Sequence, residues 1–395
     1  MLSDQKLWTK NFIFMCLANL LMSVAFYFLI PTLPIFLTEV LHAPKSKVGV
    51  IFASYTLAAL IIRPFAGYAV DGFGRSTIYL IAFFIFSLLF GVFAAVATLT
   101  QMLILRFAHG LAWGVTTTSS STAIVDIIPA HRRGEGLGYY GISMTIALAI
   151  GPFLGTIIAG KNNFETMFII AAIISLIGFI MAAMVKFPAF STSKEKKRFE
   201  WSKLYETSSF AVSLIILLVC VSYGGVVIFI SLYAKEINVD NSGIFFLVYA
   251  AGLALTRLIS GKIFDKHGPK LLTLAGMIFL ITGLFVLSFI KNYNGFLTSA
   301  LLIGAGFGIV FPTFQAMVNH IVDIKKRGVA NSTFFTAVDL GIGLGSIISG
   351  FISDLFSLTV TFIICAIIII IASIIFFVFT LPIYNQKVNA LAIKQ

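Results

Sequence analysis

We count twelve apolar runs in this chain, each about 20 residues or longer. A helix of about 20 residues rises roughly 30 Å, the thickness of the hydrocarbon core of a bilayer. Because that core offers no water to backbone groups, each run must be helical. The sequence therefore predicts an all-α membrane protein with 12 transmembrane helices, at about 12–38, 47–71, 76–97, 101–126, 134–160, 164–186, 208–233, 242–264, 270–290, 295–322, 328–354 and 358–382.

Composition and charge agree with this fold class. Apolar residues make up 59% of the chain and charged residues 11%, against roughly 45–50% and 25% in soluble domains. If the N-terminus is cytoplasmic, nineteen Lys and Arg residues fall at cytoplasmic ends and loops, and five fall outside. We therefore expect a multi-pass protein of the cell membrane, a bacterial plasma membrane, with both termini cytoplasmic. The net charge of +12 follows from topology, so we expect no nucleic-acid partner.

The two halves of the chain repeat at a constant distance. Several Arg, Gly and Asp residues recur 194 positions later without a gap: Arg63, Gly67, Asp71, Gly74, Gly110, Gly114 and Gly151 return as Arg257, Gly261, Asp265, Gly268, Gly304, Gly308 and Gly345. Parallel repeats of this kind are an architecture of secondary transporters. We expect two pseudo-symmetric six-helix bundles, 1–186 and 208–395, joined by a cytoplasmic linker at 187–207.

Three motifs resemble those of a known family. Gly67-x-x-x-Asp71-x-x-Gly74-Arg75 resembles the signature loop of the major facilitator superfamily. Arg106-x-x-x-Gly110 is similar to the second motif of that superfamily, and Gly151-Pro152-x-x-Gly155 resembles the motif of its twelve-span drug:proton antiporter branch. The resemblance implies the major facilitator fold and leans toward export.

The signature loop predicts a gate at the cytoplasmic face. Asp71 could pair with Arg75, with Asp126 or with the start of the eleventh helix. Such a latch would stabilise the outward-open state and break as the halves rock, whereas the alternative is a topological anchor with ordinary loop charges. In the second half Asp265 keeps its place but Pro269 replaces the arginine, so a second latch is weaker.

Two charges within the spans have no counterpart in the repeat. Arg106 corresponds to Ala300 and Asp339 to Thr145. An Arg within a span costs roughly 2.5–3.5 kcal/mol on insertion scales, so we expect a role in proton coupling or in binding an anionic group; the alternative is snorkelling to the outer surface. Desolvation penalises the charged form of a carboxylate near the midplane, which suits Asp339 to carry a proton. It could also hold a cationic substrate group or make a structural hydrogen bond.

Further polar and aromatic residues are candidates for the cavity lining. Each has an alternative, purely structural role: a helix–helix hydrogen bond, packing as a neutral side chain, or a ring that faces lipid. These candidates are Asn19, His109, Trp113, Tyr27, Tyr55, Tyr223 and Tyr249. Gly151-Pro152 should kink its helix, either sealing the cavity against proton leak, as the resemblance implies, or only packing the halves.

The sequence predicts a secondary active transporter that works by alternating access. The first hypothesis is proton-coupled export, an antiport, of small amphipathic molecules or drugs. The alternative is a proton-coupled carrier of a polar metabolite such as a sugar, amino acid or metal chelate. No paired catalytic carboxylates, metal-ligand cluster, nucleophile motif or phosphate-binding loop appears, so we expect no enzyme activity, no cofactor and no metal. The expected partners are a small-molecule substrate, protons and the lipid bilayer, and the protein is expected to be a monomer.

Overall fold

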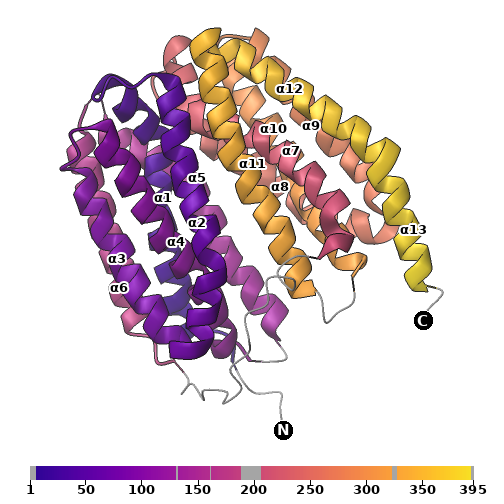
Figure 1. Ribbon diagram of the computed structural model, residues 1–395, viewed down its shortest axis with the longest axis horizontal. Helices are drawn as coiled ribbons and strands as arrows, with labels where there is room; N and C mark the ends of the chain where they lie inside the picture. The colour runs from indigo at the N-terminus through magenta and orange to yellow at the C-terminus, as the bar shows by residue number, and fades with distance from the viewer. Residues whose placement is uncertain (1–5, 130–131, 161, 188–205, 323–326, 393–395) are drawn as a thin grey trace. The chain divides into compact units, whose positions relative to one another are not determined.

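The computed structural model describes residues 6–129, 132–160, 162–187, 206–322 and 327–392 (Figure 1). All regular elements in these ranges are helices, as the sequence predicts. In chain order they are α1 (Lys10–Glu39), α2 (Lys45–Phe73), α3 (Arg75–Phe93), α4 (Leu99–Ile127), α5 (Arg133–Ala159), α6 (Phe164–Ala183), η3 (Thr207–Ser209), α7 (Phe210–Glu236), α8 (Ile244–His267), α9 (Pro269–Phe289), α10 (Tyr293–His320), α11 (Arg327–Leu355), α12 (Leu358–Ile375), η5 (Phe376–Thr380) and α13 (Leu381–Ala392). Each predicted apolar run corresponds to one of α1–α12.

Eleven helices in the described part of the chain are long and apolar enough to cross a membrane. The predicted fourth span, α4, has the length but is more polar, because it carries Arg106, His109 and the hydroxyl run 116–122. Six of these seven hydroxyls bond within their own helix; Thr116 Oγ1 donates to Ala112 O at 2.7 Å, for example. A helix that satisfies its own hydroxyls in this way is compatible with a membrane interior.

The last span extends beyond the predicted end at 382. The helix continues from α12 through the π-helical turn η5 into α13, so the apolar helical segment covers Leu358–Asn389. The sequence prediction ended this span at 382. Pro382 is the second residue of α13, and Leu381 before it is still helical and buried.

The chain divides into two compact units. Unit 1 comprises Met1–Ala43 and Ser54–Phe199, and unit 2 comprises Pro44–Ala53 and Glu200–Gln395. In unit 1, α1 packs on α5 and α6, and α3 packs on α4 and α6. In unit 2, the equivalent helices make the same pairs, with α7 on α11 and α12, and α9 on α10 and α12. The sequence repeat is therefore also a repeat of packing.

One glycine in each unit permits the same close approach between two helices. A Cβ placed on Gly110 of α4 would overlap the carbonyl oxygen of Tyr55 in α2. A Cβ on Gly304 of α10 would overlap the carbonyl oxygen of Tyr249 in α8. Both pairs are related by the 194-residue repeat, and small residues permit such backbone contact between membrane helices.

The helix α2 is the exception to a simple division. Its first turns group with unit 2, while Ser54 and the residues after it group with unit 1. The sequence placed the whole of this helix in the first bundle, because position along the chain was the only guide to the boundary. The linker predicted at 187–207 lies almost entirely outside the described residues.

Candidate functional site

The side chain of Arg106 is enclosed within unit 1. It is 1% exposed, and its guanidinium carbon lies 4.3 Å from the ring centroid of Tyr55. The start of α4 is fixed by a capping box in which Thr98 and Gln101 satisfy each other's backbone N–H groups, so Arg106 sits about two turns into a well-anchored helix. A cation over an aromatic face gains about 2 kcal/mol or more when desolvated. This position inside the unit favours a role there over snorkelling to the surface.

Aromatic rings from α1, α2 and α4 gather around this pair. Phe26 stacks on Tyr55 with centroids 5.4 Å apart and on Trp113 with centroids 4.5 Å apart. Tyr27 lies 5.3 Å from Phe26, edge to face. We call Arg106, Tyr55, Phe26, Tyr27 and Trp113 the aromatic cluster of unit 1. Sequence analysis named four of its members and missed Phe26, because one Phe among the chain's 41 carries no signal of its own.

Three phenylalanines surround His109. Its ring stacks on Phe86 at 4.3 Å, with an interplanar angle of 11°, and meets Phe90 at 4.7 Å and Phe93 at 5.4 Å. The residue is fully buried, and among the described residues neither ring nitrogen has a hydrogen-bond partner. This apolar setting favours the packing interpretation of His109 over the titrating one.

Asn19 makes a hydrogen bond between helices. Its Nδ2 donates to the carbonyl oxygen of Tyr140 in α5 at 3.3 Å, and the side chain is 7% exposed. Of the two alternatives weighed from the sequence, cavity lining or a helix–helix bond, the geometry favours the bond.

The Gly151-Pro152-x-x-Gly155 motif brings α5 against α1. A Cβ on Gly151 would lie 2.7 Å from Cβ of Tyr27, and one on Gly155 would lie 2.8 Å from Cα of Phe28. Pro152 lies between the two glycines inside α5. The motif therefore sets the distance between α1 and α5. Gly151 does so beside Tyr27, which belongs to the aromatic cluster.

Unit 2 contains a second group of stacked rings, without a cation. Tyr223 stacks on Phe307 with centroids 4.5 Å apart and lies 6.1 Å from Tyr249. Tyr249 and Phe307 occupy the positions of Tyr55 and Trp113 plus 194. The position equivalent to Arg106 is Ala300, which is fully buried.

A small apolar cavity marks the difference between the two clusters. Unit 2 has a cavity of about 10 Å³ beside Tyr223, at most the room for one water molecule. Its aliphatic lining replaces the rings that fill the equivalent place in unit 1: Leu280, Leu284 and Ile303 stand where Phe86, Phe90 and His109 stand 194 positions earlier. Aromatic rings therefore fill the place in unit 1 that corresponds to the cavity in unit 2.

Asp339 lies on α11 beside α7. Its side chain is half-buried, and it is close enough to the Cys220 thiol to interact electrostatically. The backbone of α11 approaches α7 closely there, because a Cβ on Gly341 would lie 2.5 Å from Leu217 O. Of its two carboxylate oxygens, Oδ2 is buried.

At the predicted gate, Arg75 and Asp126 form an ion pair of 2.5 Å between the start of α3 and the end of α4. Both side chains are about one third exposed. The side chains of Asp71 and Asp265 lie outside the described part of the structure. The pair joins two of the three gate charges that the sequence proposed.

Glycine is required at the turn of the signature loop. Gly74 has φ +96° between α2 and α3, and Gly268 has φ +71° between α8 and α9. L side chains rarely adopt this region, so both turns need glycine. By contrast, a Cβ on Gly67 would meet no described atom within 4 Å.

Comparison with known proteins agrees with this architecture. The Major Facilitator Superfamily model matches residues 15–323 and 212–394. The chain is 26% identical over 351 residues to the staphylopine export protein of Staphylococcus aureus (strain Mu50), covering 85% of this chain and 88% of that protein. It is 24% identical over 334 residues to the quinolone resistance protein NorA of S. aureus (strain COL), covering 82% and 85%. The crystal structure of the nucleoside transporter NupG superposes with a TM-score of 0.74 at 16% identity, covering 93% of this chain and 99% of that one.

Proposed function

Because the chain belongs to the major facilitator superfamily, and so is a secondary transporter and not an enzyme, we propose that it exports small amphipathic molecules in exchange for protons. The observation that carries the proposal is the aromatic cluster of unit 1, in which Arg106 lies over the ring of Tyr55. Flat aromatic faces bind apolar and aromatic molecules with little demand on their exact shape. Two similar proteins, by their names, export staphylopine and confer quinolone resistance.

Within this proposal, Arg106 is a positioning residue. It is 1% exposed and lies over Tyr55, so its charge fixes that ring, and through the Phe26 stack it orders Trp113. Its positive charge also favours substrates that carry an acceptor or anionic group beside the apolar body. The clusters of the two units then differ in charge, since Ala300 replaces the arginine.

Asp339 is the proposed proton carrier. It is the one acid deep within α11 of the described chain, about twelve residues from the first residue of that helix, or about 18 Å along its axis. A half-buried carboxylate there can be protonated from one side of the membrane and released to the other as the transporter alternates. The ion pair Arg75–Asp126, together with Asp71, forms the proposed inner gate.

A second candidate is a carrier for a polar metabolite, with Arg106 and Asp339 as its ligands. The enclosed charge of Arg106 favours it, because a buried guanidinium is well suited to one anionic substrate. Competition separates the two: an exporter of amphipathic molecules accepts chemically unlike competitors, and a metabolite carrier accepts only close analogues.

The direct experiment uses purified protein in proteoliposomes with an imposed pH gradient. We expect gradient-driven movement of several unrelated amphipathic dyes, collapsing when a protonophore is added. Transport that ignores the pH gradient would refute proton coupling. The proposed orientation, both termini cytoplasmic, is tested by a C-terminal reporter, and the proposed monomer by light scattering in detergent.

A further inference from the structure

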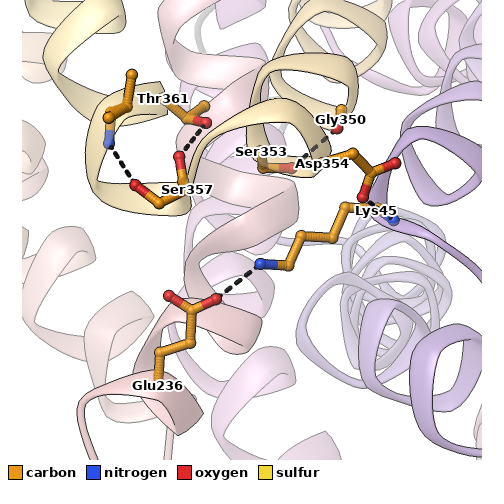
Figure 2. A network of polar contacts seen from close by, with 8 residues as sticks. Lys45, Glu236, Gly350, Ser353, Asp354, Ser357 and Thr361 are labelled. Atoms are coloured by element: carbon orange, nitrogen blue, oxygen red, sulfur yellow. Dashed lines mark hydrogen bonds and ion pairs between the residues drawn. The ribbon is translucent and has the colours of Figure 1, made fainter.

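A carboxylate at the end of α11 caps the start of α2. Asp354 Oδ1 accepts the backbone N–H of Lys45 at 2.9 Å, and Oδ2 accepts that of Ser46 at 2.8 Å (Figure 2). Lys45 and Ser46 are the first two residues of α2. The first N–H groups of a helix have no partner in their own helix and carry partial positive charge. Asp354 therefore satisfies two of them with one negative charge.

An ion pair supports the same contact. Lys45 Nζ lies 2.7 Å from Oε1 of Glu236, the last residue of α7 (Figure 2). The two side chains are 26% and 42% exposed, so this pair alone contributes little, because water screens it. Its significance is that one residue, Lys45, is held at its backbone by α11 and at its side chain by α7.

Small residues let the two helices meet backbone to backbone. Ser346, Gly350 and Asp354 are spaced by four, so they lie on one face of α11. Ser346 Oγ donates to Gly49 O at 3.0 Å, and a Cβ on Gly350 would lie 2.7 Å from Lys45 O. This stripe explains why the first turns of α2 group with unit 2. The contact between α11 and the first turns of α2 therefore has polar groups at Asp354 and small residues along the rest of its length.

The repeat does not explain these groups. The position equivalent to Asp354 is Gly160, and the one equivalent to Lys45 is Val239. The repeat therefore has neither the acid nor the base at these positions. A device present at only one of two equivalent places has a role that packing symmetry does not supply.

We propose that Asp354, Lys45 and Glu236 form a latch that closes the outer face, and that it opens once in each transport cycle. We call these three residues the outer latch. The proposal rests on the proposed transport function and on the orientation expected from the basic residues, in which α2 starts and α11 ends outside. The three residues are in contact in this structure. Its opening frees the first turns of α2 from unit 2 while Ser54 and the residues after it stay in unit 1.

The first test measures accessibility and needs neither substrate nor a proton gradient. In a background with Cys16→Ala, Cys220→Ala and Cys365→Ala, Ser346→Cys is reacted with a hydrophilic maleimide in detergent. Ser346 is fully buried against α2. Adding Asp354→Asn should raise the labelling rate about 2- to 30-fold, the range expected for a charge at a helix N-terminus. An unchanged rate would overturn the proposal.

The matched control lies one turn away on the same helix. Ser349 is 3% exposed and faces Gly225 of α7 and not α2, so Ser349→Cys should label equally slowly with and without Asp354→Asn. An equal rise at both sites would show general loosening of α11 and would overturn the latch. If Asp354→Asn does not fold, Glu236→Gln serves instead, with a smaller rise expected at Ser346→Cys alone.

A reversible staple tests whether the latch opens during turnover. Lys45→Cys and Asp354→Cys are joined in proteoliposomes by a short reagent that carries a thiol-reactive group at each end of a cleavable spacer. We expect transport to stop and to return when the reagent is cleaved. The control staple joins Ser87→Cys and Ser175→Cys, whose hydroxyl oxygens lie 2.7 Å apart inside unit 1, and should leave transport unchanged.

These outcomes separate the latch from the proposed function. Undiminished transport with the 45–354 staple closed would overturn the latch. Expected labelling in a protein that moves no substrate under a pH gradient would refute the proposed function and leave the latch standing.

Discussion

Arg106 and Tyr55 form a cation–π pair at 4.3 Å, and the repeat keeps the tyrosine but not the arginine: Tyr249 has Ala300 at the equivalent place. The two units thus share an aromatic residue at two equivalent positions, Tyr55/Tyr249 and Trp113/Phe307, and differ in the charge beside them. This relationship makes the aromatic cluster of unit 1 the first target for mutation.

Tyr55→Phe should bind substrate nearly as well as the parent protein, because the ring face that Arg106 contacts is kept. Tyr55→Leu should weaken binding by about 1–2 kcal/mol, the size of a partly desolvated cation–π contact together with a lost ring stack. The measurement is quenching of Trp113 fluorescence by a dye in a variant with Trp8→Phe and Trp201→Phe. Equal affinity in both variants would show that the ring face is not used.

Asp339→Asn should abolish transport driven by a pH gradient while leaving substrate binding and gradient-free exchange largely intact, because the amide cannot carry a proton. If Asp339 instead holds a cationic group, the same change should weaken binding by about 1.5–3 kcal/mol. Parallel binding and flux assays separate the two results. Parent-level flux under a gradient would return Asp339 to a structural role.

The ion pair Arg75–Asp126 should act together with Asp71. Asp71→Asn should leave the protein folded and slow turnover, and its effect should be non-additive with Asp126→Asn by about 0.5–3 kcal/mol in a double-mutant cycle on transport rate. The matched control is Arg132→Gln, because Arg132 pairs locally with Glu135 at 2.8 Å and should combine additively. Full additivity at Asp126 would argue against a shared inner gate.

Asp354→Asn should partly rescue Asp71→Asn. Loss of the inner gate favours the inward-open state, and loss of the outer latch favours the outward-open state, so the double variant returns toward balance. Transport rate in proteoliposomes is the readout, with Asp71→Asn plus Ser349→Ala as the control. A double variant slower than both singles would contradict the opposition of the two gates.

His109→Phe should retain transport and thermal stability, since the residue is packed among Phe86, Phe90 and Phe93. His109→Ala should lower stability by about 3–5 kcal/mol by analogy with aromatic truncations in cores. Thermal unfolding in detergent checks both variants. Lost proton coupling in His109→Phe would revive the titrating interpretation.

The helices and the repeat could be predicted because both can be recognised from the order of residues alone. Apolar runs mark spans whatever the tertiary contacts, and a constant offset fixed which helices are equivalent. It could not find Asp354, whose role depends on contact with Lys45 more than 300 positions away. Asp354 reads as an ordinary charge at a helix end until α2 is placed beside it.

The candidate site was predicted in part for the same reason. Arg106 stood out because a charge within a span is rare, and Tyr55 because its aromatic type suits a lining. Phe26 and Phe86 did not stand out, because a phenylalanine in an apolar run does not indicate which rings it stacks on. Predicting their arrangement requires the close α2–α4 and α1–α5 distances that the glycines set.

The backbone contacts at Gly110 and Gly304 have a consequence for how such a chain diverges after duplication. Each glycine holds two helices at a distance that leaves no room for change, yet the side chains one turn earlier, Arg106 and Ala300, differ completely. A gene copy can therefore alter what one half recognises by substitutions beside a fixed crossing point, while the other half keeps its shape. The rigid contacts are what make the neighbouring positions free to vary.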